Sequence, residues 1–253
     1  QQATEAARKL REELQFAAHL QNTLLRVDEM PSYCQVRTLF QPGGAVSGDF
    51  LRVQYFPESD HVRAVVADAM GHNISAAFIS LIAASGLDHT DPELAPCYIL
   101  EALNEAFVSY DTHLYVTAEI VHLNAAGEVQ MSNAGHPQPL LLPAQGVPRV
   151  VGAAGGFALG MFGDAGIEFD LDRLRLEPRD RLIIYSDALT ERRLADGTVL
   201  NADWWLAELS ARRTPASIDE LRALIERRLH ESEPLGATDD LTVVILEYRP
   251  PAS

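Results

Sequence analysis

The sequence predicts an α+β fold built on antiparallel sheets. Its strand-like segments are grouped along the chain, without the regular strand–helix alternation that builds parallel sheets. Short turns separate them, marked by Gly43, Gly44 and Gly48 and by the run 124–127. No repeat or linker interrupts residues 31–249, so we expect one domain there, preceded by a helical segment over 1–30 and followed by a tail over 250–253.

The N-terminal segment, residues 1 to about 28, is rich in Ala, Leu, Glu, Arg and Gln and contains neither Gly nor Pro. We expect a helix that Pro31 ends. A coiled-coil seam is suggested by Ala7, Leu10, Leu14, Ala17, Gln21 and Leu24. Gln21 interrupts that seam, which leaves two interpretations. The helix packs on its own domain, or it is a switch helix that forms a homodimer through residues 7–24 and joins the domain to an upstream sensory or receiver domain.

The remaining elements follow from hydrophobic pattern and from turn and capping residues. The expected strands span 36–40, 50–56, 62–67, 115–123, 129–132, 140–142, 149–151, 167–176, 181–186 and 241–248. The expected helices span 74–84, 96–108, 202–213 and 217–229, the last opening on the capping box Ser217–Glu220.

Composition excludes several kinds of partner. The chain has 253 residues, with 36 acidic residues against 20 Lys and Arg, and a net charge of −16. This charge disfavours nucleic acid and anionic membranes as partners. The two cysteines form no disulfide framework, and neither a signal peptide nor an apolar run of about 18 residues is present. We therefore expect a cytoplasmic protein that does not enter the membrane.

Acidic residues stand at the ends of several expected strands. Asp68 and Asp187 each follow a hydrophobic run, while Asp49 and the pair Asp239 and Asp240 each precede one. Such carboxylates can converge at one edge of a sheet, where they repel one another unless a divalent cation lies among them. Hard oxygen ligands without a His or Cys cluster favour Mg²⁺ or Mn²⁺ over zinc. Taken alone, an aspartate at a strand end is more often a turn former or a helix cap.

Five motifs occur in a fixed order along the chain. They are SGDF (47–50), ADAMGH (67–72), SNAGHPQP (132–139), YSDALTE (185–191) and TDDLT (238–242). Over residues 33 to 248 this series resembles the PPM-type, or protein phosphatase 2C-like, metal-dependent Ser/Thr phosphatases, and most closely their bacterial SpoIIE/RsbU branch. The preceding residues 13–21 are similar to the helix that leads into that branch's catalytic domain.

The resemblance implies a four-layer αββα sandwich, with two antiparallel sheets between helices and two Mn²⁺ or Mg²⁺ ions at one sheet edge. A metal-activated water would attack the phosphorus, and Asp68 and Asp187 would be the catalytic acids. The residues that the resemblance assigns to the metals are Asp49, Asp68, Ala69, Asp187 and Asp239.

Within that set, the resemblance implies that Asp68 bridges the two ions and that the Ala69 carbonyl binds one of them. Asp187 and Asp239 would complete the shell of the first ion, and Asp49 would bind the second, directly or through water. Asp240 competes with Asp239, and the match to the family's metal aspartate favours Asp239.

The chain departs from the family pattern at four positions. Arg52 stands where the family often has a second acid, and we expect it to be structural or to face the phosphate. Ser47, Asn73 and Ala188 stand where the branch usually has Gly. Asn73 is the mildest change because Asn tolerates left-handed backbone. Ala188 adds a methyl group beside an expected ligand and could distort the turn.

Other residues of the motifs have more than one possible role. His72 and His136 could contact the phosphate or donate a proton to the leaving serine oxygen, or each could fix its own loop through hydrogen bonds. Glu191 could support the metal site or be an acid at a helix start. We expect Asn133 to tie its own turn.

The expected function is that of a protein phosphatase acting on phosphoserine or phosphothreonine of a regulatory protein. In the resembled branch this partner is a STAS-type anti-sigma-factor antagonist, and the output is control of a sigma factor. By analogy, the chain would be the output domain of a response regulator of the RssB kind. Two alternatives are an inactive phosphatase-fold adaptor that binds a regulatory protein, and a dimerising scaffold with a structural metal.

Overall fold

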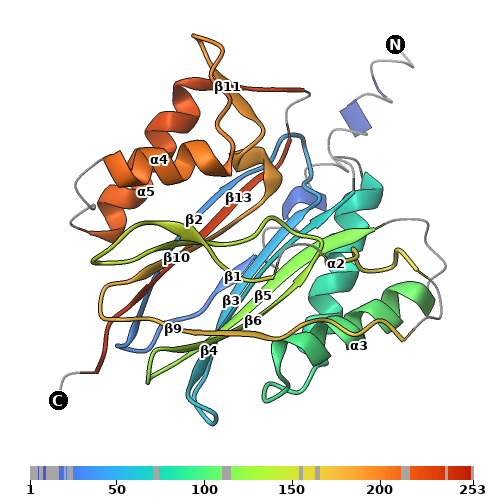
Figure 1. The fold of residues 1–253 in the computed structure, drawn as a ribbon. Coiled ribbons are helices and arrows are strands. Elements are labelled where there is room, and N and C mark those ends of the chain that lie inside the picture. The colour runs from blue at the N-terminus through green and yellow to red at the C-terminus, as the bar shows by residue number, and fades with distance from the viewer. Residues whose placement is uncertain are drawn as a thin grey trace.

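The computed structural model arranges the chain in four layers, with two sheets packed face to face and helices on both outer sides (Figure 1). It describes residues 5, 8–9, 17–19, 21, 25–70, 74–109, 115–153, 156–162, 166–211, 217–236 and 239–251, without the side chains of Ile74 and Ser109. The predicted α+β class and αββα sandwich are confirmed.

The first sheet has the strand order β1-β3-β4-β5-β6-β9. β1 pairs parallel to β3, and the other neighbours are antiparallel. Its strands are β1 (Arg26–Val27), β3 (Asp49–Phe56), β4 (His61–Ala69), β5 (Val116–Asn124), β6 (Glu128–Ala134) and β9 (Asp172–Arg175).

The second sheet has the order β2-β13-β10-β7-β8 and is antiparallel throughout. Its strands are β2 (Cys34–Gln41), β13 (Leu241–Tyr248), β10 (Arg181–Tyr185), β7 (Leu140–Leu142) and β8 (Arg149–Val150). A separate two-stranded ribbon pairs β11 (Arg192–Leu194) with β12 (Ser232–Pro234).

Two helices cover each outer face (Figure 1). The first sheet carries α2 (Ile74–Asp88) and α3 (Pro96–Ser109), and the second carries α4 (Ala202–Ala211) and α5 (Ile218–His230). The predicted cap of α5 is present, because the Ser217 hydroxyl accepts a hydrogen bond from the Glu220 amide at 3.1 Å. A 3₁₀ turn, η1 (Asp187–Leu189), follows β10 directly. No helix among these described segments is long and apolar enough to cross a membrane.

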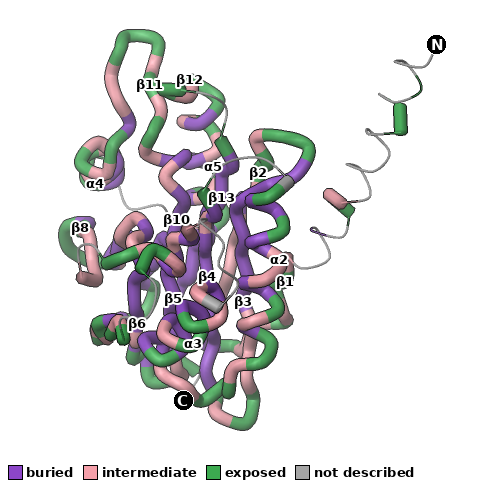
Figure 2. Tube along the Cα trace, turned by 90° about the vertical axis from the view of Figure 1, so that its right-hand side faces the viewer, coloured by how far each residue is buried: buried purple, intermediate pink, exposed green. Residues whose placement is uncertain are grey.

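Three hydrophobic clusters fill the spaces between the layers. Successive residues of a strand point to opposite faces, so Val65 packs under α2 and α3 while Val66 packs between the sheets. On the second sheet, Val244 lies between the sheets and Val243 packs under α4 and α5. The strands run as buried cores through the molecule (Figure 2). Both sheets are therefore rigid supports for whatever their edges carry.

Two predicted elements differ from the structure. The N-terminal helix does not reach residue 28, because Arg26 and Val27 form β1 against Arg52 and Val53. This pairing satisfies backbone groups of β3 that would otherwise form an open sheet edge. The strand expected over 167–176 is reduced to β9, since only these residues have partners on β6. The ribbon β11–β12 was not predicted, and the domain boundary near residue 30 stays a prediction.

Candidate active site

The first pair of predicted acids lies on neighbouring strands. Asp49 opens β3 and Asp68 lies near the end of β4, and the two residues are direct partners in the antiparallel ladder. Leu51 and Val66, each two residues away, are in the core between the sheets. By strand alternation Asp49 and Asp68 therefore face the same inner side. Asp49 is almost completely buried, at 1% exposure.

The second pair comes from turns at the edge of the other sheet. β10 ends at Tyr185, two residues before Asp187, and β13 begins two residues after Asp239. Ser186 joins the two strands, because its amide donates to the Thr242 carbonyl and its hydroxyl accepts from the Thr242 amide, both at 2.9 Å. Asp187 and Asp239 therefore lie at the same end of this sheet.

Asp240 ties the two sheets together at that end. Its two carboxylate oxygens accept hydrogen bonds from the backbone amides of Gly43 and Gly48, each at 2.6 Å. Gly48 directly precedes Asp49, and its carbonyl accepts the Ala69 amide at 3.2 Å. Buried hydrogen bonds to a charged acceptor are among the stronger polar contacts. Asp240 thus holds the end of the first sheet against the end of the second.

The carboxylates affect one another's protonation. Burial, then the Asp187, Asp239 and Asp240 charges, raise the pKa of Asp68 to about 8. Burial and the Asp239 and Glu191 charges raise the pKa of Asp187 to about 6. The pKa of Asp49 is well above its ordinary range because of burial and then the Asp68 charge. A cation bound among these acids would favour their ionised forms.

The donor chemistry of this edge fits a divalent cation. The buried carboxyl group of Asp49 lies within reach of the side chains of Thr242, Ser186 and Asp68. Buried oxygens among repelling carboxylates are ligands that Mg²⁺ and Mn²⁺ accept. Among the described residues, however, no group of three or more His, Cys, Asp or Glu side chains is already arranged to hold a metal ion.

Arg52 has a structural role and does not face a phosphate. It is buried on the outer side of β3, with its guanidinium paired to Asp88 and donating to the Ala84 carbonyl of α2 at 3.3 Å. Its Cζ also lies 5.4 Å from the Phe50 ring centroid. Strand alternation places it on the opposite face from Asp49. The phosphate-facing alternative for Arg52 is therefore wrong.

The small departures from the family pattern are accommodated locally. The Ala188 methyl group packs into the cluster under α4 and α5, and η1 forms with a regular Leu189-to-Ser186 hydrogen bond of 3.0 Å. The hydroxyl of Ser47 accepts the Asp49 amide at 3.0 Å. Gly71, His72 and Asn73 lie outside the described residues, so the predictions for His72 and Asn73 remain predictions.

Of the remaining motif residues, Asn133 and His136 form a buried network beside the strand partner of Asp68. Asn133 ties its turn as predicted, because its side chain accepts from the His136 amide at 2.9 Å and donates to the His136 carbonyl at 2.8 Å. His136 is 4% exposed, so its side chain is covered by the surrounding residues. Its predicted contact with the phosphate stays a prediction. Glu191 lies after η1, not at the start of an α-helix, and its amide donates to the Asp187 carbonyl at 2.9 Å.

Sequence reasoning missed the role of Gln21. Its side chain is buried, accepts the Ser47 amide at 2.8 Å and donates to the Ser47 carbonyl. The polar residue that interrupts the expected seam therefore binds the chain two residues before Asp49. The signal that could have revealed this contact was the polar Gln21 at an otherwise apolar position of the expected coiled coil. The homodimer through residues 7–24 stays a prediction, since Ala7, Leu10, Leu14 and Leu24 lie outside the described residues.

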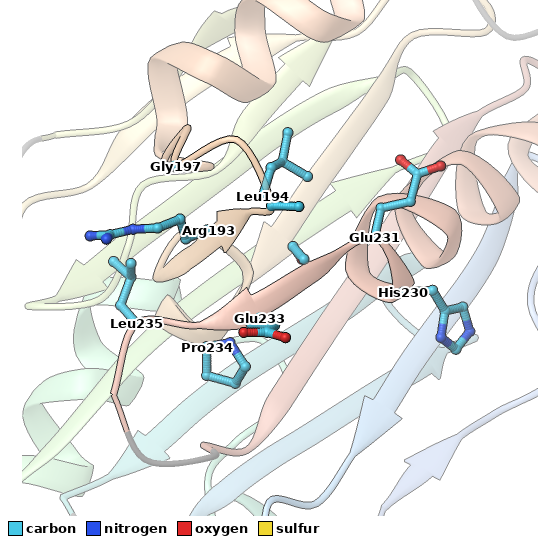
Figure 3. Close-up of a pocket in the computed structure, with 10 residues that line it drawn as sticks. Arg193, Leu194, Gly197, His230, Glu231, Glu233, Pro234 and Leu235 are labelled. Atoms are coloured by element: carbon cyan, nitrogen blue, oxygen red, sulfur yellow. The ribbon is translucent and has the colours of Figure 1, made fainter.

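A large cavity lies beside the ribbon β11–β12. It has a volume of about 600 Å³ and is lined by the ribbon β11–β12 and the end of α5 (Figure 3). Arg193, His230, Glu231 and Glu233 are among the residues that line it. None of the predicted site residues contributes to its wall, so the cavity is not the candidate active site.

A comparison of the sequence with models of protein families shows which family this chain belongs to. Residues 58–249 match the model described as Stage II sporulation protein E (SpoIIE). The chain belongs to the SpoIIE family. The predicted resemblance to protein phosphatase 2C-like proteins of this branch is confirmed.

Solved structures share the fold of this SpoIIE-family chain. The RsbU and RsbW domains of Rv1364c from Mycobacterium tuberculosis are 23% identical with a TM-score of 0.74, covering 87% of this chain and 61% of that one. The SiaA-PP2C domain of Pseudomonas aeruginosa is 18% identical with a TM-score of 0.78, covering 96% and 98%. RsbX, in complex with magnesium, is 18% identical with a TM-score of 0.62, covering 87% and 98%. No curated protein matches the chain.

Proposed function

We propose that this SpoIIE-family phosphatase uses Mn²⁺ or Mg²⁺ to hydrolyse phosphoserine or phosphothreonine on a regulatory protein. One observation carries the proposal. Asp49 and Asp68 face each other in the ladder, while burial and then charges from the other sheet, including Asp187, raise the pKa of Asp68 to about 8. Such an arrangement is unfavourable without a cation, and family membership gives its chemical purpose.

The predicted ligands have distinct places in this proposal. Asp68 would bridge two ions, with the Ala69 carbonyl and Asp187 on the first ion and Asp49 on the second. Asp239 would complete the first shell in preference to Asp240, because both Asp240 oxygens are already bonded to backbone amides. When bound, the ions would activate a water molecule and neutralise charge on the phosphoryl oxygens. RsbX, of similar fold, has been crystallised with magnesium, which supports the choice of ion.

The protein's own residues would supply orientation and charge. The ladder between β3 and β4 fixes Asp49 and Asp68, and Asp240 fixes the distance between the sheets. Buried carboxylates would orient both ions with little rearrangement, which is the usual source of catalytic power in phosphoryl transfer. No side chain described at this edge is a cationic group that would compete with the ions for the phosphate.

The substrate that we propose is a STAS-type anti-sigma-factor antagonist carrying a phosphorylated serine or threonine. The support comes from the similar structures, one of which joins an RsbU domain to an RsbW domain, while another is described as part of the bacterial stressosome. The chain spans 61% of the first of these. A response-regulator context of the RssB kind, with an upstream sensory or receiver domain and sigma-factor control as output, belongs to the same proposal.

The experiment measures phosphate release from a phosphorylated STAS protein and from an aryl phosphate, with millimolar Mn²⁺, with Mg²⁺ and with chelator. We expect hydrolysis with either metal and none with chelator. Asp68→Asn should reduce the rate by at least about 10³-fold, because one oxygen of the bridging acid is lost. Circular dichroism checks that the variant is folded. Metal-independent turnover, or full activity of Asp68→Asn, would contradict the proposal.

An adaptor without turnover is the second candidate, favoured by the lack of a ready metal cluster among the described residues. The two candidates differ in a simple binding experiment. An adaptor would bind the phosphorylated STAS protein with the same affinity whether or not Mn²⁺ is present, and it would release no phosphate from it.

A further inference from the structure

The acids of the candidate site form a carboxylate edge with two halves, Asp49 and Asp68 on the first sheet and Asp187 and Asp239 beside the second. His136 lies between these two halves. Its Nδ1 atom is 2.8 Å from the Thr117 hydroxyl, and Thr117 is the direct ladder partner of Asp68 on the neighbouring strand. At this end of the first sheet, Asp49, Asp68 and Thr117 therefore form a row on the inner face. The imidazole of His136 contacts the last member of this row, Thr117.

The other side of the ring faces the second sheet. On that side the backbone carbonyl of Tyr185 interacts with the imidazole and acts to raise its pKa. Tyr185 is the last residue of β10, two positions before Asp187. The Nε2 atom is buried and makes no hydrogen bond with the described residues. The ring therefore lies between β5, the strand next to Asp68, and β10, the strand that leads to Asp187.

A second layer of contacts immobilises His136. Asn133 binds both the amide and the carbonyl of His136, as described above. Asn133 also donates to Oε2 of Glu119 at 2.7 Å, on the strand that carries Thr117. Glu119 is buried, and burial raises its pKa well above the ordinary range. Burial therefore disfavours the charged form of this acid.

The charge state of His136 suits a place near cations. Burial lowers its pKa to about 3, so the imidazole is neutral at ordinary pH. A protonated histidine here would repel divalent ions bound by Asp68, whereas a neutral ring can hold its neighbour in place without that cost.

We propose that His136 is a positioning residue, whose ring fixes Thr117 on β5 and thereby the place of the neighbouring Asp68. The inference rests on the proposed function, in which Asp68 bridges two cations. It assigns His136 a role that differs from both earlier alternatives, because the ring neither touches the phosphate nor merely closes its own loop. Its loss acts first on metal affinity.

The test compares variants of His136 with a matched histidine. His122 is also buried on the same sheet, with an unpartnered Nε2 and a pKa lowered to about 3 by burial, but it lies on β5 at the opposite end from Thr117. Mn²⁺ affinity is measured by titration calorimetry, and the thermal midpoint of the metal-free protein is measured for each variant. Both His136→Leu and His122→Leu should lower the midpoint. Only His136→Leu should weaken Mn²⁺ binding, by about 10- to 100-fold.

Two further variants keep the test decisive if His136→Leu fails to fold. His136→Asn places an amide near the position of Nδ1 and should recover most of the Mn²⁺ affinity. Thr117→Val removes the hydroxyl at nearly constant volume and should weaken Mn²⁺ binding in the same direction. In a double variant of both sites the two losses should not add, because they act through one contact.

The outcomes separate this inference from the proposed function. Unchanged Mn²⁺ affinity in both His136→Leu and Thr117→Val, or an equal loss in His122→Leu, would overturn the positioning role. If wild-type protein binds Mn²⁺ but hydrolyses no phosphate while His136→Leu binds less tightly, the positioning role stands and the phosphatase proposal fails. If wild-type protein binds no Mn²⁺, both are wrong.

Discussion

The two halves of the carboxylate edge are built differently. Asp49 and Asp68 lie within paired strands, where ladder register fixes them opposite each other. Asp187 and Asp239 lie on turns just outside β10 and β13, and Asp239 is exposed. The first half is therefore preorganised at the cost of burying charges that repel, whereas the second half keeps closer contact with solvent and depends on neighbouring contacts for its position.

The consequence is that the halves should respond differently to substitution and to pH. Changes near the first half should alter both stability and metal affinity, because its acids are paired within the sheet. Changes to an acid of the second half should alter metal affinity more than stability. Asp240 is the exception that joins them, since it belongs to the second sheet but binds Gly43 and Gly48 beside the first.

The largest effect is expected from comparing Asp239→Ala with Asp240→Ala. Removing the Asp240 carboxylate leaves two backbone amides unpaired in a buried place and should destabilise the protein by about 3–5 kcal/mol. Asp239→Ala should change stability by less than about 0.5 kcal/mol, since the side chain is exposed, but should abolish tight Mn²⁺ binding. Urea unfolding and Mn²⁺ titration measure the two quantities. If the two variants behaved alike, the distinction between these neighbouring acids would be wrong.

A medium effect is expected in the pH dependence of the metal-free protein. The folded-state pKa of Asp68, about 8, lies above that of an unfolded aspartate, so the folded state binds more protons and stability should fall as pH rises from about 4 to 8. For Asp187, with a folded pKa of about 6, the same loss should end near pH 6. Thermal midpoints measured across this range, with and without Mn²⁺, check the sign.

The variants Asp68→Asn and Asp187→Asn sharpen this contrast. Asp68→Asn should remove most of the loss between pH 6 and 8, while Asp187→Asn should affect only the lower part of the range. Saturating Mn²⁺ should flatten the profile of the wild-type protein, because a cation replaces the bound protons. A metal-free protein whose stability rises between pH 6 and 8 would contradict the arrangement of the first half.

Much of this edge could be predicted because it follows from local pattern. An aspartate that adjoins a hydrophobic strand is brought to an end of the sheet, so the sequence could predict that Asp49, Asp68 and Asp187 lie at sheet ends. Their role as metal ligands stays a prediction. Strand alternation alone places Arg52 on the face opposite Asp49. Its partners, Asp88 and the Ala84 carbonyl, could not be predicted, because they depend on how α2 packs on β3. Choosing between Asp239 and Asp240 required the positions of Gly43 and Gly48, nearly 200 residues earlier.

Long-range polar contacts were the least predictable part. Glu119 lies in an otherwise hydrophobic strand, and its acidic character gave no sign that Asn133 would bind it across the ladder. Thr117 gave no sign either, since threonine is common in strands. Their partners are set by how β5, β6 and the following turn come together, which depends on the whole fold and not on any local pattern.

The smallest effect is expected at Gln21, and it tests how firmly the first half is held. Gln21 binds both backbone groups of Ser47, and the Ser47 hydroxyl in turn accepts the Asp49 amide. Gln21→Ala should therefore destabilise the protein by about 1–2 kcal/mol, the value of two lost hydrogen bonds. It should weaken Mn²⁺ binding by less than about 10-fold, because the ladder still holds Asp49 opposite Asp68.

The matched control for Gln21 is His19→Ala, because His19 lies on the same N-terminal segment but is exposed. It should change neither stability nor Mn²⁺ affinity. If His19→Ala equals Gln21→Ala in both measurements, the segment acts as a whole and the contact with Ser47 is not decisive. If Gln21→Ala weakens Mn²⁺ binding as much as Asp239→Ala does, the first half is not preorganised by its ladder. Its geometry then depends on the N-terminal segment, just as the second half depends on its turns.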